Sequence, residues 1–490
     1  MDARRAKAIP GVVAVVEFPG DSNAQGGVAV LAHNTWIARQ GRDALDIEWN
    51  ESPALKQGSD DIAARFRKLV QMPGIVAVSR GTIMTDPPQG GKVIEATFEQ
   101  PYLAHAPMEP MNCLVQLHSD RCEIWNGEQF HTLDQNNVAM DLGLKPAQVH
   151  ITQLFAGGSF GRRANPRSDY VRTTARIARA AQSQGINAPI KMVWMREDDM
   201  RAAQYRPLTV HRVRLALDGT GKLVSWHQSL VGQPFTSLHG SHTADSHLVE
   251  GASDVPYDIP NFRVEAHSPE DINVPTQWLR SVGHTHTAFV GETLIDEAAR
   301  ATGKDPYAFR RAMLANRPKD LAVLDLAAEK SGWLTPLKAG ESGERRARGM
   351  ALQFAFGTHV AQVAEVTVHR DGSYTVDRVV CAVDCGVPIN PAIIESQMES
   401  GIGFGLGFLR QSITIKEGRV TQGNFNDYPV IRMNDMPKIE VYIVPSTDQP
   451  TGVGEPGVPP IAPAVVNAIS SVTGRSYRSL PLSDSILANT

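Results

Sequence analysis

The chain has 490 residues, of which 42% are hydrophobic and 20% are charged, so it can bury several cores. A chain of this length is expected to form roughly two to four domains. The chain has 48 Lys and Arg against 52 Asp and Glu, so its formal net charge is -4. This small value excludes a strong overall electrostatic field of either sign. We therefore expect neither a nucleic acid nor an anionic membrane as its partner. The longest apolar runs are shorter than the ~20 residues that span a bilayer.

The chain opens without a typical N-terminal element. The stretch AKAIPGVVAVVEF, residues 6–18, leads almost directly into a proline-led strand with no opening helix, as if an element were cut in half. We therefore expect a truncated or split domain at the start. The first residues lack a secretory signal, which favours the cytoplasm, and a periplasmic location stays open if the true N-terminus is missing.

Strands and helices alternate through the rest of the chain, which predicts an α+β fold. Three stretches have the pattern of paired strands, with turns at residues 119–120, 218–219 and 371–372. Three helices carry clear end signals. The first starts at residues 168–169 and ends at Gly185, the second opens at 305–306, and the third runs from about 462–463 to Gly474.

The chain is predicted to divide into three consecutive blocks, residues 1–100, 101–320 and 345–490. Between the last two lies the charged segment 316–348, which ends in a glycine-punctuated basic stretch and is predicted to connect two domains. The phrase MPGIVAVSRG at 72–81 resembles the opening strand. Two short matches are too few to indicate a repeat architecture.

Four cysteines occur in the chain, at Cys113, Cys122, Cys381 and Cys385. Neither close pair has the two-residue spacing of zinc knuckles and many iron-sulfur sites, so we expect no iron-sulfur cluster in this chain. Cys381 and Cys385 lie in VVCAVDCGV, which has the pattern of a buried strand. They are expected to be buried thiols and not a redox pair.

Several common catalytic and nucleotide-binding motifs are missing from the sequence. It has no P-loop, no GxSxG elbow and no HExxH motif. The stretch GIGFGLGF at 401–408 fails the dinucleotide fingerprint because its glycines fall at every second position, and we expect them to allow close packing of backbone. His284 and His286 would share one face of a strand. Without a third ligand nearby, they are expected to be core or solvated histidines and not a metal pair.

A glycine-rich stretch is the first candidate for chemistry. In LFAGGSFGRRANPRSDYV, residues 154–171, Gly157, Gly158 and Gly161 leave a turn without side chains. Its N–H groups can therefore converge on an oxyanion or a metal-oxo group, and Arg162 and Arg163 would add positive charge. The same residues could equally form a surface turn with two solvated arginines, and the spacing does not decide between the two.

Five motifs, in this order, resemble those of one family. They are AHAPMEPMNC (104–113), GGSFGRR (157–163), WLRSVGHTHTAF (278–289), VDCGVPINPAIIESQMESGIGFGLG (383–407) and GVGEPGVPPIAPAVVNAI (452–469). The chain resembles the molybdopterin-binding large subunit of the xanthine dehydrogenase and aldehyde oxidase family, and within it the isoquinoline 1-oxidoreductase beta-subunit branch. The resemblance implies molybdenum-cofactor-binding domains in the second and third blocks, preceded by a partial α/β hammerhead domain in the first.

Under this resemblance the chain is a molybdenum hydroxylase whose catalytic glutamate falls on Glu455. That residue lies in a run of glycine, proline and aliphatic residues that offers it no cation. Burial among apolar groups would disfavour its charged form and make it a stronger general base, which accepts a proton as oxygen attacks an electron-poor carbon. Arg280 matches the active-site arginine of the family, and its guanidinium would stabilise negative charge that develops on a substrate heteroatom.

The remaining site residues are also carried over from the family. The implied cofactor-binding residues are Gly157, Gly158, Phe160, Gly161, Arg162, Gln397 and Gly454. Among them, the backbone of Phe160 and Gly161 matches the loop that approaches the molybdenum. Met108 and Glu109 lie in a segment that lines the pocket in the family. They are expected to pack and to position neighbouring groups, and not to act as catalysts. Ser159 stands where the family commonly has glycine, which would alter the approach of the loop.

The resemblance also implies cofactors and partners. The cofactor is molybdopterin cytosine dinucleotide with molybdenum, and [2Fe-2S] clusters are expected only on a partner, a small iron-sulfur subunit with two such clusters. A c-type cytochrome is a further partner that the resemblance allows as electron acceptor. The glycine-rich MGQG-type segment of the family is missing here, so either a separate chain supplies it or this is a truncated reading of a longer gene.

Three functions stay open. The first is hydroxylation of an N-heteroaromatic ring carbon with water as the oxygen source. The second is oxidation of an aldehyde to a carboxylic acid by the same cofactor, because both small-molecule substrates present an electrophilic carbon. The third is a non-catalytic truncated fragment that binds no molybdenum.

Overall fold

A computed structural model describes residues 1–21, 25–235, 243–338, 340, 343–483 and 486 of the chain. The chain divides into two compact units, each built from two segments. The first unit comprises Met1–Leu55 and His105–Gln204, and the second comprises Lys56–Ala104 and Tyr205–Thr490. The predicted blocks follow one another along the chain, whereas each compact unit combines an early segment with a later one.

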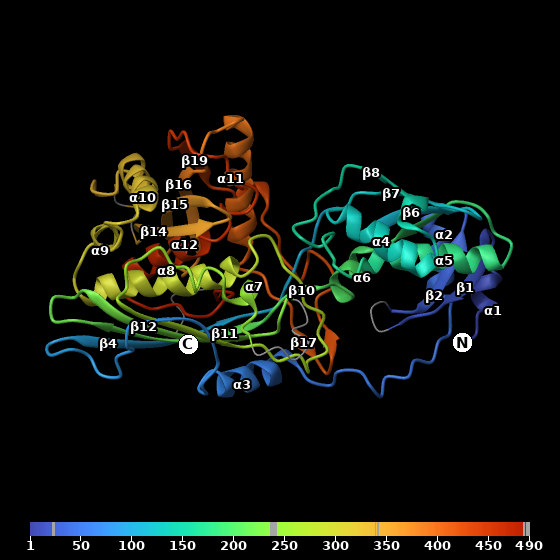
Figure 1. Cartoon of the computed structure of the whole chain (residues 1–490), viewed down its shortest axis with the longest axis horizontal. Helices are drawn as coiled ribbons and strands as arrows, with labels where there is room; N and C mark the ends of the chain where they lie inside the picture. The colour runs from blue at the N-terminus through green and yellow to red at the C-terminus, as the bar shows by residue number, and fades with distance from the viewer. Residues whose placement is uncertain (22–24, 236–242, 339, 341–342, 484–485, 487–490) are drawn as a thin grey trace. The chain divides into compact units, whose positions relative to one another are not determined.

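The first unit contains a four-stranded sheet and a two-stranded hairpin (Figure 1). Its strands are β1 (Val12–Phe18), β2 (Gly27–Ala32), β6 (Asn112–Leu117), β7 (Cys122–Asn126), β8 (Val149–Gln153) and β9 (Ile190–Val193). Its helices are α1 (Arg4–Lys7), α2 (Thr35–Asp43), α4 (His131–Leu142), α5 (Asp169–Ser183) and α6 (Arg196–Arg201), with a 3-10 turn at Pro146–Gln148. The sheet order is β8-β7-β6-β9, and β7 runs parallel to β8.

Helix α5 packs against both the sheet and the hairpin of this unit. Val171, Ala175 and Ala178 recur at helical spacing and join the core against β6. Ile177 packs beside Val16 of the hairpin. Two faces of one helix thereby bring the sheet and the hairpin into one unit.

The second unit contains two larger sheets with helices between them (Figure 1). The strands of its five-stranded sheet, in spatial order, are β3 (Ile75–Arg80), β13 (Asn261–His267), β12 (Leu223–Gly232), β11 (Thr209–Leu217) and β4 (Lys92–Gln100). Those of its four-stranded sheet are β14 (Arg345–Ala355), β15 (Thr358–Val368), β16 (Tyr374–Asp384) and β19 (Lys438–Ile443). Two short pairs are β5 (Leu103–Ala104) with β10 (Tyr205–Arg206), and β17 (Ile415–Lys416) with β18 (Arg419–Val420).

Two helices join these sheets. The helices of the second unit are α3 (Ser59–Leu69), α7 (Ser246–Val249), α8 (His284–Ala301), α9 (Pro306–Ala312), α10 (Pro318–Ser331), α11 (Pro391–Gly407) and α12 (Ile461–Thr473), with a 3-10 turn at Met433–Asp435. Helix α8 contacts β4 and β11, and it also contacts α12, which packs on β14 and β15. Trp226, Phe289, Val363 and Val465, from both sheets and both helices, are each at most 1% exposed in one continuous core.

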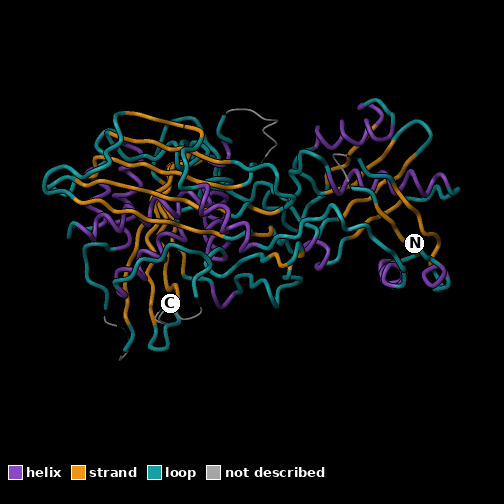
Figure 2. Tube along the Cα trace, turned by 90° about the horizontal axis from the view of Figure 1, so that it is seen from below, coloured by secondary structure: helices purple, strands orange, loops and turns teal. Residues whose placement is uncertain are grey.

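The predicted α+β class, turns and helix ends are confirmed. Figure 2 shows helices and strands mixed in both units. The pairs β6–β7, β11–β12 and β15–β16 are antiparallel and turn where the sequence predicts. At the start of α9, the Asp305 carboxylate accepts a hydrogen bond from the Ala308 amide at 2.9 Å. Helix α12 ends at Gly474, which has a left-handed φ of 70°.

Two local predictions about the chain's organisation are wrong. The short helix α1 precedes the first strand, where no opening helix was expected. The segment 316–348, predicted to connect domains, contains α10 and the start of β14, and α10 packs on β15 and β16. That segment is therefore part of the core of the second unit. Its residues 339 and 341–342 lie outside the described residues.

The two histidines predicted on a strand lie instead in the first turn of α8. Both are buried, and His284 Nδ1 lies 3.0 Å from Gln353 Nε2 while His286 Nδ1 lies 3.1 Å from His211 Nε2. Burial lowers the pKa of His284 to about 4 and the pKa of His286 well below its usual value. They are core histidines. In the part of the chain that the structure describes, no group of three or more His, Cys, Asp or Glu could hold a metal ion.

The glycines of GIGFGLGF and the cysteines behave as predicted. A Cβ on Gly401 would lie 3.0 Å from the backbone of Gly457, and one on Gly405 would lie 2.7 Å from the carbonyl oxygen of Val458. These glycines of α11 therefore allow close backbone packing against the loop before α12. All four cysteines are buried free thiols, and Cys381 lies in β16.

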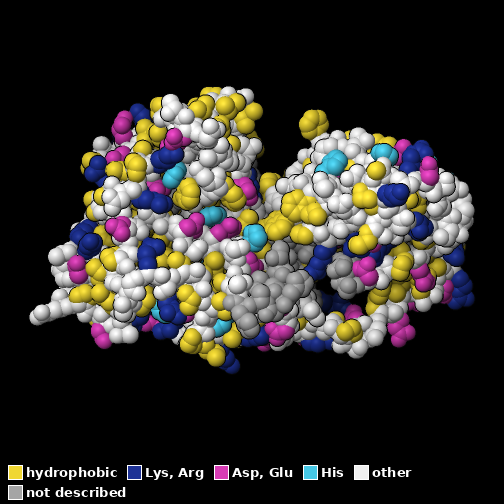
Figure 3. All heavy atoms as spheres, in the orientation of Figure 1, with side chains coloured by type: hydrophobic (Ala, Val, Ile, Leu, Met, Phe, Trp, Pro, Cys, Tyr) yellow, Lys and Arg dark blue, Asp and Glu magenta, His cyan; other side chains and the backbone are white. Residues whose placement is uncertain are grey.

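The charge distribution agrees with the small net charge of the sequence. Figure 3 shows Lys and Arg side chains interspersed with Asp and Glu side chains over the visible face. None of the helices among the described residues combines the length and the apolarity needed to cross a bilayer.

Candidate active site

Glu455 lies in the loop that leads into α12, as predicted, and its main chain and side chain are both held by one residue. The amide of Ser281 donates a hydrogen bond to Glu455 Oε1 at 2.8 Å. The Ser281 hydroxyl donates to the Glu455 carbonyl oxygen at 2.6 Å. Because these bonds fix the backbone and the carboxylate together, they restrict the direction in which the carboxylate can point.

The residues that hold Glu455 form a strained turn before α8. Ser281 and Val282 have φ values of 82° and 47°, in the left-handed region that residues other than glycine seldom occupy. Such conformations cost about 1–3 kcal/mol each and persist where surrounding contacts enforce them, often at functional sites. One of these contacts is the hydrogen bond from the Val282 amide to the Leu279 carbonyl oxygen, at 2.6 Å.

Arg280 ties the Glu455 loop to α11. Its Nε donates to the Gly454 carbonyl oxygen at 2.7 Å, one terminal nitrogen donates to Ser400 Oγ at 3.0 Å, and the other donates to Gln397 Oε1 at 3.1 Å. All three nitrogens of a guanidinium that is only 9% exposed are thus engaged by protein. Burial lowers the pKa of Arg280, and the negative charge of Glu455 opposes that effect. Arg280 therefore links the Glu455 loop to α11 through hydrogen bonds at both.

The environment of Glu455 differs from the prediction in one respect. The sequence around it offers no cation, but the fold places the Arg280 guanidinium within electrostatic reach. The residue is half-buried. The Ser281 amide and the Arg280 guanidinium thus lie near a glutamate whose neighbours in the sequence offer it no cation.

The glycine-rich loop lies in the first unit and has a backbone that glycine makes possible. Gly158 and Gly161 have φ values of 97° and 102°, and Phe160 between them has a φ of 56°. A Cβ on Gly157 would lie 2.5 Å from the Cβ of Glu109. Part of the loop therefore packs too closely on Glu109 to admit a side chain at position 157.

Arg162 and Arg163 are neither solvated nor directed to the surface of the loop, because each is only 1% exposed. Arg162 forms a two-point ion pair with Asp169, at 3.1 and 2.8 Å. Arg163 donates to the carbonyl oxygens of Gly158 at 3.2 Å and Gly127 at 3.0 Å. The buried Arg163 guanidinium thus binds the loop backbone from inside the protein. A direct role of Arg162 in cofactor binding stays a prediction.

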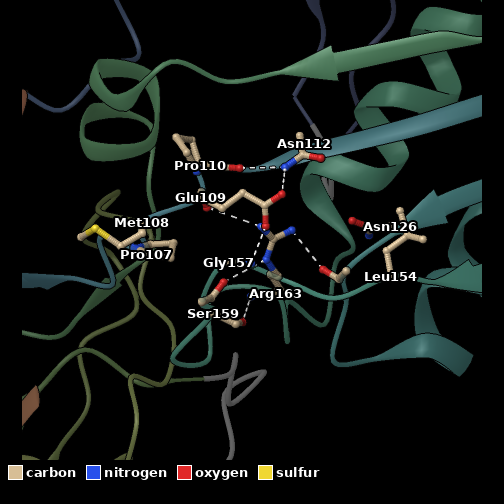
Figure 4. A network of polar contacts seen from close by, with 12 residues as sticks. Pro107, Met108, Glu109, Pro110, Asn112, Asn126, Leu154, Gly157, Ser159 and Arg163 are labelled. Carbon is tan, nitrogen blue, oxygen red and sulfur yellow. Dashed lines mark hydrogen bonds and ion pairs between the residues drawn. The ribbon is translucent and has the colours of Figure 1, made fainter. Parts of the chain in front are cut away.

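Glu109 connects the loop to the segment before β6 (Figure 4). Its carboxylate accepts hydrogen bonds from the Gly157 amide at 2.6 Å, Asn112 Nδ2 at 2.9 Å and a terminal nitrogen of Arg163 at 3.0 Å. Burial acts to raise the pKa of Glu109, but these donors and the charge of Arg163 lower it below its usual value. The Gly157 amide is thereby used within the protein.

The predicted site residues form two groups, one within each unit. In the second unit Arg280, Gln397, Gly454 and Glu455 form one connected group. In the first unit, Gly157, Gly158, Phe160, Gly161 and Arg162 share the loop that Arg163 and Glu109 brace. Met108 is exposed.

Neither Ser281 nor Ser400 has a role that was predicted from the sequence. Ser281 directly follows Arg280 in WLRSVG, so its place in that motif is the only signal that could have identified it. Nothing in the local sequence marks Ser400.

Comparison with known proteins identifies relatives along the whole chain. Two protein-family models, both described as a molybdopterin cofactor-binding domain, match residues 72–314 and 296–437. The chain is 31% identical to the isoquinoline 1-oxidoreductase subunit beta of Brevundimonas diminuta, over 98% of this chain and 62% of that protein. It is 27% identical to the membrane-bound aldehyde dehydrogenase [pyrroloquinoline-quinone] of Gluconacetobacter polyoxogenes, over 98% of this chain and 65% of that protein. The chain thus spans less than two thirds of the length of these relatives.

Solved structures show the same fold. Quinoline 2-oxidoreductase from Pseudomonas putida 86 aligns with a TM-score of 0.78 at 16% identity, over 98% of this chain and 91% of that chain. The aldehyde oxidoreductase from Desulfovibrio desulfuricans aligns with a TM-score of 0.76 at 16% identity, over 98% of this chain and 74% of that chain. With the family models and the sequence relatives, these findings show that the chain belongs to the molybdopterin cofactor-binding family of the aldehyde oxidoreductase and xanthine dehydrogenase type.

Proposed function

We propose that this chain is the catalytic part of a molybdenum hydroxylase large subunit that hydroxylates a ring carbon of an N-heteroaromatic compound, with water as the oxygen source. The observation that carries the proposal is the geometry of Glu455. Its carboxylate is held at Oε1 by the Ser281 amide, and among the described residues Oε2 has no hydrogen-bond partner. One oxygen is thus oriented and the other is available to accept a proton.

The residues present fit the cofactor that the family binds. In the second unit, Gly454 is exposed, and a Cβ there would find only Gln397 Oε1, at 3.9 Å, within 4 Å among the described residues. In the first unit, Gly158 and Gly161 have left-handed backbone, and a Cβ on Gly157 or Gly158 would contact Glu109 or Pro107. In the second unit, we infer that Gln397 and Gly454 contact molybdopterin cytosine dinucleotide; a role of the glycine loop of the first unit in binding it stays a prediction. When bound, the molybdenum cofactor supplies the two-electron redox chemistry at the substrate carbon.

The chain's own residues then have separate tasks. Glu455 Oε2 accepts the proton released as oxygen attacks the electron-poor carbon. Ser281 keeps the carboxylate oriented, so less reorganisation is needed in the transition state. Arg280 fixes the backbone at Gly454 and the side chain of Gln397, which sets the distance between the base and the cofactor-binding helix.

The sequence relative named for isoquinoline supports the N-heteroaromatic substrate, since it is 31% identical over 98% of this chain. Aldehyde oxidation is the second candidate, supported by the relative named aldehyde dehydrogenase at 27% identity. For electron transfer we propose a small subunit with two [2Fe-2S] clusters, because the four cysteines here are buried and dispersed. A c-type cytochrome would serve as the final acceptor.

Co-expression with the candidate small subunit tests the proposal. Molybdenum content is measured first, and then dye reduction is measured with isoquinoline, quinoline and aliphatic and aromatic aldehydes. We expect bound molybdenum and turnover of the N-heteroaromatic compounds. Turnover of aldehydes alone would replace the first candidate by the second. Absence of molybdenum under every co-expression condition would contradict both and favour a non-catalytic fragment.

A further inference from the structure

A second carboxylate holds the other end of the turn that orients Glu455. Glu250 follows α7, and its Oε1 accepts a hydrogen bond from the Gly283 amide at 2.8 Å. Gly283 lies two residues beyond Ser281, whose amide binds Glu455 at 2.8 Å. The strained turn at residues 281–283 is therefore held by a carboxylate at each end.

The backbone around Glu250 packs directly on this turn. A Cβ on Gly283 would lie 2.1 Å from the carbonyl oxygen of His247 and 2.8 Å from Cγ of Glu250, so only glycine fits there. The carbonyl oxygen of Glu250 accepts a hydrogen bond from the Thr287 hydroxyl at 2.8 Å. Glu250 is thus bound to Gly283, just before α8, through its side chain and to Thr287, in the first turn of α8, through its main chain.

The charges that face Glu250 make its protonation sensitive to its neighbours. Burial raises the pKa of Glu250 to about 7, and the negative charges of Asp254 and Glu455 add to the rise. The Gly283 amide and His247 act in the opposite direction.

The pKa values of two neighbouring histidines are shifted in opposite directions. A hydrogen bond to Asp245 raises the pKa of His247. His284 follows Gly283, and its pKa of about 4, lowered by burial, keeps it uncharged near neutral pH.

We propose that Glu250 is a positioning residue of the active site, which fixes the far end of the turn at residues 281–283 so that the Ser281 amide stays directed at Glu455. The inference rests on the proposed role of Glu455 as the base. A left-handed Ser-Val pair relaxes to ordinary backbone angles unless contacts on both sides prevent it. Glu455 supplies the contact on one side and Glu250 supplies it on the other.

Hydrogen-deuterium exchange of the co-expressed complex tests this positioning without using activity. Glu250→Ala removes the acceptor for Gly283 and should raise exchange of the peptide at 279–286 at least tenfold. Glu250→Gln keeps an acceptor oxygen and should restore most of the protection. The control is Asp254→Ala, which removes a similar bond, from the Gly251 amide at 2.7 Å, without touching the turn.

The outcomes separate this inference from the proposed function. Unchanged exchange at 279–286 in Glu250→Ala, or an equal increase in Asp254→Ala, would overturn the positioning role whatever the activity. Full activity of Glu455→Gln would instead refute the base assignment.

If Glu250→Ala does not fold, Glu250→Gln alone still tests whether Glu250 occupies the environment described here. Its thermal midpoint should exceed that of the unaltered protein by a margin that grows from pH 5 to pH 8, because the amide avoids ionisation in a partly buried site. A margin that stays constant over this range would contradict the inference.

Discussion

The Ser281 amide reaches the Glu455 carboxylate across 174 positions of sequence and binds it at 2.8 Å. The Ser281 hydroxyl binds the carbonyl oxygen of the same glutamate at 2.6 Å. The start of α8 and the loop before α12 are therefore fixed to each other at the residue that the family resemblance makes catalytic.

Glu455→Gln should retain the fold and the molybdenum content while turnover falls by about 10²–10⁴-fold. The amide oxygen can still accept the Ser281 hydrogen bond, but the side chain can no longer take up a proton. The measurement is kcat for substrate-dependent dye reduction beside metal analysis. Glu395→Gln, an exposed position on α11, is the matched control and should behave like the unaltered protein.

Arg280→Lys should loosen the Glu455 loop although it keeps the positive charge. One ammonium group cannot bind Gly454, Ser400 and Gln397 in the fixed directions of a guanidinium. Loss of charged hydrogen bonds of about 1.5–3 kcal/mol each predicts a fall in kcat/KM of roughly tenfold or more. Arg410→Lys, at a partly exposed ion pair with Asp435, serves as the control. An unaltered kcat/KM in Arg280→Lys would show that this link between loop and helix is not needed.

Glu109→Ala should lower the molybdenum content of the purified complex. It removes the acceptor for the Gly157 amide and leaves the buried Arg163 without its carboxylate. Because the Glu109 side chain is 39% exposed, the loss in stability should fall below the 3–5 kcal/mol that is typical of a broken buried pair. Metal analysis and thermal unfolding measure the two effects. Glu48→Ala, an exposed position in the same unit, should change neither.

The stability of the protein should decrease as the pH rises through 7, with Glu250 as one cause. The pKa of this carboxyl is about 7 in the folded protein against 4.5 for an ordinary glutamate. Its contribution is fully present below pH 4.5 and is lost as the pH rises through 7. The loss is at most about 3 kcal/mol, and solvent screening at this partly exposed site reduces it. Unfolding by denaturant at several pH values, with Glu250→Gln as the reference, measures it.

Local signals in the sequence determined much of the fold. Asp-Gly turns, the Asp305 cap and the terminal Gly474 act within a few residues, so the hairpins and helix ends could be predicted from the sequence alone. Among the alternating glycines of 401–407, Gly401 and Gly405 pack closely on backbone as predicted, whereas Gly403 and Gly407 face the side chains of Met436 and Gln411. The five motifs placed the chain in its family because their order and composition are specific.

Only the tertiary structure decided which residues meet. The stretch HTHT alternates like a strand, but packing of α8 against β4 and β11 makes it helical and buries His284 and His286. The spacing of glycines and arginines in the sequence could not reveal that Arg163 is buried and binds the backbone of the glycine loop. Nor could it show that Glu250 and Glu455, far apart in the chain, hold one turn. These contacts depend on long-range packing, which a short window of sequence does not contain.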